Sequence, residues 1–352
     1  MLLQETLKQH DNNKFEFHYI YFLPWKDQMV KGLQDAGGIV KNLPARNNVI
    51  IALQTGKIIR YIKSNNIQML HCHLPWAGFV GRFIHMITGI PVLYSEHNKQ
   101  ERYHWITKAI NKLTFNRQTK VIAVSNDVAA SIEKFIHPKI PVQTILNGVS
   151  MEHFVRNREA GFTTRKQNGI EQGCILIGTI AVFRFQKRLK EWIDVFKVMQ
   201  KKFPGIRGCI VGDGILNIEI RTYLKEQGME EAILFPGLQT NVLPWLSAMD
   251  IFMMTSEFEG LPVALLEAMS MECAVVCTDA GGIKEVIRNR TDGFMVPVND
   301  WMELQKPLTY LLENPAEIKV FGKKARQRVE EAFSLKVMVA EMEAMYPGVV
   351  IK

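Results

Sequence analysis

Apolar and polar residues follow two alternating patterns along most of the chain. Short apolar runs of strand length alternate with longer stretches in which apolar residues recur every three or four positions, as on one face of a helix. In the first 150 residues, the strand patterns cover residues 16–23, 68–73, 91–95, 120–124 and 142–146. Helical patterns cover residues 76–88 and 125–135, and Ser125 is placed to cap the second of these helices. This alternation predicts α/β layers with mostly parallel sheets.

The periodic signal fades between residues 151 and 173, where Arg, Asn, Gly and Thr are frequent, and a second alternating set follows. We place the connection between two domains in this stretch. Strand patterns of the second set cover residues 174–181, 208–211, 232–235, 251–255, 274–278 and 294–296. Its helical patterns cover residues 189–201, 218–227, 242–249, 263–269 and 283–288, and a helix-rich tail begins at residue 301. We therefore expect domains at residues 1–155 and 156–333 and a tail at residues 334–352.

The composition, with 47% hydrophobic and 22% charged residues in 352, is that of a globular protein large enough for two cores. It excludes wholesale disorder, and no apolar run reaches the ~18–20 residues that a membrane-spanning helix needs. The first residues turn polar too early for a signal peptide. The five cysteines lack the spacing of a metal site, and we expect reduced thiols in a cytoplasmic protein.

The net charge of +8 is concentrated in the first 150 residues, which hold 18 Lys and Arg against 9 Asp and Glu. The remaining residues hold 25 against 26. A basic half suggests an anionic partner for one domain. The most basic stretch, residues 99–120, also contains aromatic residues, which favours an anionic membrane surface over nucleic acid. The alternative is a surface helix whose apolar side packs on its own domain, and the sequence leaves both interpretations open.

Residues 250–287 carry the pattern with the clearest chemistry. An apolar strand pattern is followed by Glu259, by residues 260–262 and by a helical pattern in which Glu267 lies eight residues after Glu259. Eight residues are about 2.2 helical turns, so both carboxylates can face a ligand at the start of the helix. The free amides of that end suit a diphosphate, and carboxylates suit the hydroxyl groups of ribose and hexose. This combination points to a nucleotide-sugar ligand.

The same block resembles the donor-site signature of the family 4 retaining glycosyltransferases, in which a strand leads into S-x-x-E-G-[FL]-[GP]-x-x-x-L-E-A-M and a later G-G-x-x-E. The chain matches this signature in register at Ser256, Glu259, Gly260, Leu261, Pro262, Leu266, Glu267, Ala268, Met269, Gly281, Gly282 and Glu285. The resemblance implies that Glu259 faces the transferred sugar, that Glu267 holds the ribose hydroxyls, and that residues 260–262 lie at the diphosphate, with Ser256 beside them. The chain has Glu272 and Ala274 where the family usually has Gly and Pro, and we expect only an effect on stability.

Two cations, Arg184 and Lys187, follow the first strand pattern of the second domain. Cations at the carboxyl end of a strand can offset the charge that develops on a leaving nucleoside diphosphate. Many relatives carry the Arg earlier, where this chain has Val182, but one branch of the family has the F-R-x-x-K-R pattern found here. The resemblance therefore implies phosphate contacts for Arg184 and Lys187. Residues 212–214, Gly-Asp-Gly, match a tight turn of the family, and we interpret them as architecture.

In the first domain, residues 95–98 follow a strand pattern, and their His97 resembles the family histidine that points into the cleft and hydrogen-bonds the donor sugar. A histidine suits this task because it can donate or accept a hydrogen bond near neutral pH. His73 resembles a position near the acceptor side. His71 and His73 flank Cys72, but a metal site would need further ligands, and we expect no metal.

The resemblance fails only at the start of the chain. Relatives open with a strand and a Gly-Gly loop, whereas residues 1–9 look like the end of the helix that follows that loop. We expect a truncated chain in which the sheet of the first domain lacks a central strand and has an unpaired edge. A protein extended by about 20–30 residues, the size of one strand–loop–helix unit, should be more stable and more active.

The family implies a GT-B fold, in which two Rossmann-like domains face each other across a cleft and the helical tail packs back on the first domain. It implies a retaining transferase that moves a hexose from a nucleotide-diphosphate sugar, most often a UDP-sugar, to a glycan or lipid-linked acceptor, as in surface polysaccharide synthesis. No cofactor is implied, and we expect a cytoplasmic enzyme that contacts the inner face of the membrane peripherally. Two alternatives stay open: a catalytically impaired protein that binds nucleotide sugars, and a nucleotide-sugar 2-epimerase or hydrolase.

Overall fold

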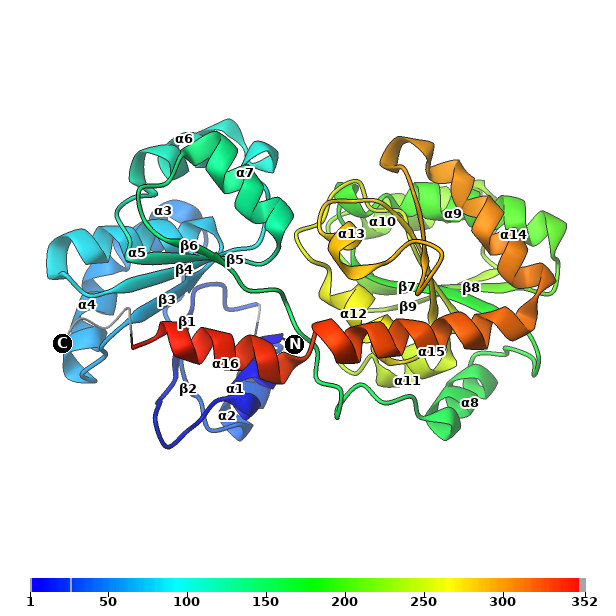
Figure 1. Cartoon of the computed structure of the whole chain (residues 1–352), viewed down its shortest axis with the longest axis horizontal. Coiled ribbons are helices and arrows are strands. Elements are labelled where there is room, and N and C mark those ends of the chain that lie inside the picture. The colour runs from blue at the N-terminus through cyan, green and yellow to red at the C-terminus, as the bar shows by residue number, and fades with distance from the viewer. Residues whose placement is uncertain (1, 26, 348–352) are drawn as a thin grey trace. The chain divides into compact units, whose positions relative to one another are not determined.

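The computed structural model describes residues 2–25 and 27–347 and divides the chain into two compact units (Figure 1). Unit 1 comprises residues 1–148 and 335–352, and unit 2 comprises residues 149–334. The chain thus enters unit 2 after Gly148, before the predicted boundary at residue 155, and leaves it after Ser334, one residue beyond the predicted end at 333.

In the described part of unit 2, six strands form a parallel sheet in the order β12-β11-β10-β7-β8-β9. The strands are β7 (Leu176–Val182), β8 (Arg207–Asp213), β9 (Ile233–Gly237), β10 (Ile251–Met254), β11 (Ala274–Thr278) and β12 (Phe294–Val296). Numbered within the unit, this is the order 3-2-1-4-5-6 of a doubly wound, Rossmann-like sheet. The order reverses between the neighbours β7 and β10, and ligands of such sheets bind beyond the carboxyl ends of the strands at this point.

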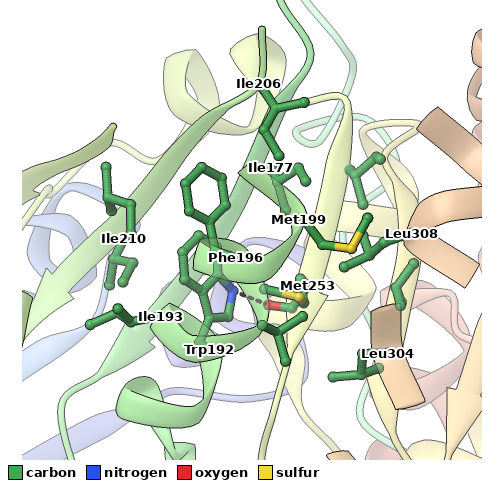
Figure 2. Packing of buried hydrophobic residues seen from close by; sticks show 14 of the residues in the cluster. Ile177, Trp192, Ile193, Phe196, Met199, Ile206, Ile210, Met253, Leu304 and Leu308 are labelled. Atoms are coloured by element: carbon green, nitrogen blue, oxygen red, sulfur yellow. Dashed lines mark hydrogen bonds between the residues drawn. The ribbon is translucent and has the colours of Figure 1, made fainter. Parts of the chain in front are cut away.

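The helices of unit 2 are α8 (Arg158–Gln167), α9 (Leu189–Lys202), α10 (Asn217–Glu226), α11 (Leu243–Ala248), α12 (Val263–Ser270), α13 (Ile283–Val286), α14 (Gln305–Glu313) and α15 (Pro315–Ala332), with the 3-10 helices η2 (Phe185–Lys187) and η3 (Val298–Leu304). Figure 2 shows the core between α9 and the sheet, where the rings of Trp192 and Phe196 stack. Trp192 Nε1 donates a hydrogen bond of 3.0 Å to the carbonyl oxygen of Met253. This contact fixes α9 against β10.

The larger sheet of unit 1 is also parallel, with the order β3-β4-β5-β6. Its strands are β3 (Leu70–His73), β4 (Val92–Glu96), β5 (Lys120–Ala123) and β6 (Val142–Thr144). Consecutive residues of β4 point to opposite faces of the sheet and enter two different cores: Tyr94 packs with Ile132 of α7, and Leu93 packs with Met338 of α16. The helices α5 (Pro75–Thr88), α6 (Trp105–Thr114) and α7 (Asn126–Ile136) belong to one face of the sheet, and α16 (Leu335–Met345) covers the other. Helix α16, which lies in the predicted tail, therefore packs on unit 1.

Two further strands of unit 1, β1 (His18–Tyr21) and β2 (Ile39–Asn42), form a separate parallel pair. A cavity of about 800 Å³ lies between this pair and the larger sheet, and residues of both β1 and β3 line it. Among the described residues no strand joins the two sheets. The expected absence of a central strand and the expected truncation both stay predictions.

The sequence patterns missed several elements. No element was expected between residues 24 and 67, where the structure has β2, α2 (Val30–Asp35), α3 (Asn48–Leu53) and α4 (Thr55–Ser64). Helix α8 lies within the stretch that was interpreted as a connection. It was missed because its sequence, REAGFTTRKQ, is mostly polar and only Gly161 and Thr164 of the helix are buried. Gly161 allows this close packing, since a Cβ there would lie 2.6 Å from the carbonyl oxygen of Ser247.

Candidate active site

The loops that follow β7 and β10 carry four of the predicted donor-site residues. Arg184 and Lys187 follow β7, and Ser256 and Glu259 follow β10. The two strands are parallel neighbours, so their loops leave the same edge of the sheet. Because the strand order reverses here, the helices after the two loops diverge and leave room for a ligand. These residues therefore lie where a doubly wound sheet binds its ligand.

Lys187, Ser256 and Glu259 are in direct contact. Lys187 Nζ lies 2.5 Å from Glu259 Oε1, and Ser256 Oγ donates a hydrogen bond of 2.7 Å to the same oxygen. Both charged side chains are largely shielded from solvent. An ion pair with so little exposure is screened less by salt than one at the surface. The contact holds one cation and one carboxylate at a fixed place beside the start of α12.

Three hydrogen bonds to backbone carbonyl oxygens tie the segment after β10 to the loop after β7 and to the end of β11. The amide of Glu257 donates to the carbonyl oxygen of Gln186 at 2.7 Å, and Thr255 Oγ1 lies 2.8 Å from the carbonyl oxygen of Arg188. Thr278 Oγ1, at the end of β11, donates to the carbonyl oxygen of Ser256 at 2.6 Å. The loops therefore form one connected scaffold, which limits the movement of the side chains that they carry.

Residues 260–262 lead from Glu259 into α12, and all three are buried. The first amides of an α-helix have no partner within the helix, and the helix dipole adds partial positive charge at that end. The start of α12 can therefore bind a phosphate group through its backbone.

Glu267 lies in the second turn of α12 and is only 5% exposed. No hydrogen bond or ion pair joins its carboxylate to a residue in the described part of the chain. Burial without a partner disfavours the charged form, and it raises the pKa of Glu267 to about 7. A buried carboxyl group that no described residue hydrogen-bonds is available to the hydroxyl groups of a ligand.

Arg184 is exposed, and its guanidinium forms no ion pair with a described residue. The neighbouring turn at residues 212–214 has a structural role. At Gly212, where φ is +134°, a Cβ would lie 1.9 Å from the carbonyl oxygen of Ala181. Glycine therefore lets the end of β8 approach the end of β7. Asp213 Oδ1 accepts a hydrogen bond of 2.7 Å from the amide of Gly214, which completes the turn.

In unit 1, three histidines gather at the carboxyl ends of β3 and β4. His73 Nδ1 lies 3.1 Å from His97 Nε2, so one of these nitrogens donates to the other, and His71 Nε2 lies 2.8 Å from Ser95 Oγ. Burial lowers the pKa of His97 to about 4, that of His71 to about 3, and that of His73 well below its ordinary value. All three rings are therefore neutral at pH 7, where they can donate or accept hydrogen bonds without adding charge.

The sequence analysis assigned no role to Glu96, the residue before His97. Its buried carboxylate accepts hydrogen bonds from the amides of His97 and Asn98 at 3.0 and 3.2 Å. It also accepts from Tyr103 Oη at 2.5 Å and from Gln100 Nε2 at 2.6 Å. Burial raises the pKa of Glu96 despite these donors. The carboxylate therefore fixes the loop that carries His97. The sequence signal that could have identified this role is an acidic residue at the end of a strand, followed within seven residues by Gln100 and Tyr103 as hydrogen-bond donors.

The structure thus joins Lys187, Ser256 and Glu259 in unit 2, and His73 and His97 in unit 1. Arg184 and Glu267 belong to the same two loop–helix segments of unit 2 but make no side-chain contact with that cluster. Within residues 2–25 and 27–347, no group of three or more His, Cys, Asp and Glu side chains is arranged to hold a metal ion. The roles that the resemblance assigned to these residues stay predictions.

Two family models match consecutive parts of the chain. The one described as Glycosyltransferase Family 4 matches residues 8–153, and the one described as Glycosyl transferases group 1 matches residues 162–328. The chain belongs to glycosyltransferase family 4. This confirms the family predicted from the sequence, and the predicted GT-B fold is confirmed by the parallel α/β units and by their likeness to solved structures.

Among characterised proteins, the chain is similar to the Escherichia coli "UDP-Gal:alpha-D-GlcNAc-diphosphoundecaprenol alpha-1,3-galactosyltransferase", with 22% identity over 84% of this chain and 79% of that protein. It is also similar to the "N-acetyl-alpha-D-glucosaminyl L-malate synthase" of Bacillus anthracis, with 28% identity over 64% of this chain and 58% of that protein. The structure of Anabaena HepE in complex with UDP and glucose superimposes with a TM-score of 0.86 at 17% identity, over 98% of this chain and 95% of that one. At this identity the likeness concerns the fold.

Proposed function

We propose that this glycosyltransferase moves a hexose from a UDP-sugar to a glycan or lipid-linked acceptor, with retention of the anomeric configuration. The observation that carries the proposal is the arrangement at the switch point of unit 2. A buried carboxyl group that forms no hydrogen bond or ion pair with a described residue, a shielded Lys–Glu pair and the start of a helix lie on adjacent loop–helix segments. The choice of UDP and of a lipid-linked acceptor rests on the printed name of the Escherichia coli relative.

Each group of the donor has a matching group in unit 2. Glu267 accepts hydrogen bonds from the ribose hydroxyls, which takes the place of water around its carboxylate. The diphosphate lies at the first amides of α12, with Lys187 and Arg184 as counter-charges. Lys187 exchanges its contact with Glu259 for the phosphate, which frees that carboxylate to bind hydroxyl groups of the sugar. No metal is required for charge balance in this scheme, because two cations and the helix amides face the diphosphate.

In the transfer step, the bond between the anomeric carbon and the phosphate oxygen breaks, and its electron pair stays on the phosphate. The acceptor oxygen forms the new bond on the same face of the sugar, and its proton passes to the leaving phosphate oxygen. Lys187 and Arg184 stabilise the negative charge that develops on that phosphate. His97 is neutral at pH 7 and hydrogen-bonds a hydroxyl group of the sugar.

A second candidate is a protein that binds the donor without transferring the sugar. The separate β1–β2 pair and the cavity beside it favour this candidate, because they leave the larger sheet of unit 1 with an uncovered edge. A 2-epimerase or hydrolase acting on the same donor is the third candidate, and it differs from the transferase in needing no acceptor.

A thermal-shift screen with UDP, GDP, ADP and their hexose conjugates tests the donor site first. We expect UDP and UDP-hexoses to raise the melting temperature most. NMR analysis of the product formed with an acceptor extract then tests the reaction, and an α-linked product from an α-configured donor is the expected result. A β-linked product contradicts retention, and the absence of a shift with every nucleotide contradicts the donor site.

A further inference from the structure

Unit 1 buries an arginine that has no part in the site described above. Arg82 of α5 is 0% exposed, and its guanidinium forms no ion pair with a described residue. It lies 4.9 Å from the centroid of the Tyr94 ring and 5.0 Å from that of Phe115. Aromatic faces attract a cation, but a buried charge is costly unless hydrogen bonds and an opposite charge compensate it. The hydrogen bonds of Arg82 lead to such a charge.

Three consecutive hydrogen bonds connect Arg82 with the carboxylate of Glu96. Arg82 Nη1 donates to Asn111 Oδ1 at 2.7 Å, and Asn111 Nδ2 donates to Gln100 Oε1 at 2.6 Å. Gln100 Nε2 then donates to Glu96 Oε2 at 2.6 Å. All four side chains are fully buried. We refer to them as the Arg82–Glu96 relay.

The direction of these hydrogen bonds is fixed by the two ends of the relay. A guanidinium can only donate, and an ionised carboxylate can only accept. The amide oxygens of Asn111 and Gln100 must therefore lie on the side of Arg82, and their NH2 groups on the side of Glu96. Hydrogen bonds aligned in this way polarise one another where the dielectric is low. The buried cation and the buried anion thus stabilise each other without direct contact.

The relay ends at the backbone of His97. The second carboxylate oxygen of Glu96, Oε1, accepts the hydrogen bonds from the amides of His97 and Asn98. The other members of the relay belong to three different elements, namely α5, α6 and the 3-10 helix η1 (Gln100–Arg102). Figure 1 shows α5 and α6 in unit 1. The loop that carries His97 is therefore tied to two helices through buried polar groups.

Helix α6 depends on the same contact. Asn111 is its only buried side chain among the described residues, whereas Trp105 is 72% exposed and Leu113 is 82% exposed. These two apolar side chains do not pack on their own domain, which corrects one of the two interpretations that the sequence left open for this stretch. No described helix, α6 included, is long and apolar enough to cross a membrane. The buried contact of α6 with the rest of unit 1 is polar.

We infer that Arg82 and Asn111 are positioning residues for His97. Neither touches the donor in the proposed scheme, and both act through Glu96, whose carboxylate holds the start of the loop. The inference rests on the proposed function in one respect, because His97 is there the residue that hydrogen-bonds the sugar. Breaking the relay should displace His97 and lower turnover, while the nucleotide site of unit 2 stays intact.

Hydrogen exchange of the His97 and Asn98 amides tests the relay without any substrate. Asn111→Ala removes its central link, so these amides should exchange at least about tenfold faster than in the wild-type protein. Arg82→Lys keeps the charge but lacks the planar group that donates to Asn111 and Gln118 at once, and it should also speed the exchange. This second variant decides the question if Asn111→Ala does not fold. Wild-type exchange rates in the folded variants would overturn the inference.

A double-mutant cycle with Glu96→Gln separates positioning from a general structural effect. Asn111→Ala alone should lower kcat about fivefold and leave UDP affinity unchanged. In the Glu96→Gln background the same substitution should lower kcat less than about twofold, because the connection to the loop is already broken. Equal losses in the two backgrounds would show that Asn111 does not act through Glu96, and this result would overturn the inference.

Gln54→Ala is the matched control in unit 1. Gln54 is 6% exposed, and its Nε2 donates to the carbonyl oxygen of Pro44, outside the relay. The control should keep the wild-type kcat and the wild-type exchange of the His97 and Asn98 amides. A loss of kcat equal to that of Asn111→Ala would overturn the inference. If the wild-type chain transfers no sugar, the proposed function fails, and the exchange measurement alone decides whether the relay holds the loop.

Discussion

Replacing Glu267 by Gln should stabilise the protein at alkaline pH while it weakens donor binding. The pKa of the buried carboxyl group is about 7, compared with 4.5 for an ordinary Glu. Because the folded-state pKa is the higher one, the folded protein binds the proton more tightly. The stability that this carboxyl group contributes is therefore complete below pH 4.5 and is lost as the pH rises through 7. The difference corresponds to about 3 kcal/mol in the free energy of unfolding.

Urea unfolding at pH 5 and pH 8 measures this effect, with Trp192 in the core of unit 2 as a fluorescent reporter. Between pH 5 and pH 8, the free energy of unfolding should fall by up to about 3 kcal/mol more in the wild-type protein than in the Gln variant, because the variant has no proton to lose at this position. Glu226→Gln, at an exposed position of α10, is the control and should keep the wild-type pH dependence. An equal pH dependence in wild type and Glu267→Gln would show that the carboxyl group is not buried as described.

The same titration should govern donor binding. Only the ionised carboxylate accepts hydrogen bonds from both ribose hydroxyls, so UDP should bind the wild-type protein more weakly at pH 6 than at pH 8. In Glu267→Gln the affinity should be at least tenfold lower at pH 8 and should depend less on pH, as for a lost charge-assisted contact. Isothermal titration calorimetry measures both quantities.

Three further predictions follow from contacts in the two units. Lys187→Ala should lower turnover or UDP affinity at least tenfold, because it removes a counter-charge of the diphosphate, and unchanged steady-state kinetics would refute that role. Glu96→Gln should lower kcat about tenfold and leave UDP affinity unchanged, because it loosens the loop of His97 in unit 1. A loss of UDP affinity in calorimetry would contradict the prediction that Glu96 affects turnover but not nucleotide binding. Gly212→Ala should lower the free energy of unfolding by about 2–4 kcal/mol, because its Cβ would collide with the carbonyl oxygen of Ala181, and a wild-type urea midpoint would exclude that clash.

The sequence predicted those parts of the fold in which periodicity and burial agree. The buried strands β7, β10 and β11 are apolar runs in the sequence, and the predicted ends of these strands lie within one or two residues of the observed ends. Between residues 24 and 67, α2 and α3 have six residues each and β2 has four, which is too short for a clear period. Helix α4 has ten residues and buries Ile58 and Ile62 on one face, so its pattern was overlooked in the sequence. Helix α8 was missed because its contact with α11 rests on Gly161 and not on apolar side chains.

The sequence identified individual residues of the site, but it could not predict the contacts that depend on strand order. Lys187 and Glu259 are 72 positions apart, and their contact follows from the pairing of β7 with β10, which no local pattern reveals. The role of Glu96 depends on the path of the loop after β4, which folds back so that Gln100 and Tyr103 reach its carboxylate. The burial of Glu267 away from any hydrogen-bonding side chain of the described residues is likewise a property of the packed structure.

A crystal structure of the complex with UDP tests the central claim most directly. The account predicts that the Glu267 carboxylate lies within hydrogen-bond distance of the ribose hydroxyls, that the diphosphate sits at the first amides of α12, and that Lys187 has moved from Glu259 to a phosphate oxygen. UDP bound elsewhere, with the Lys187–Glu259 pair intact and Glu267 still without a partner, would contradict it.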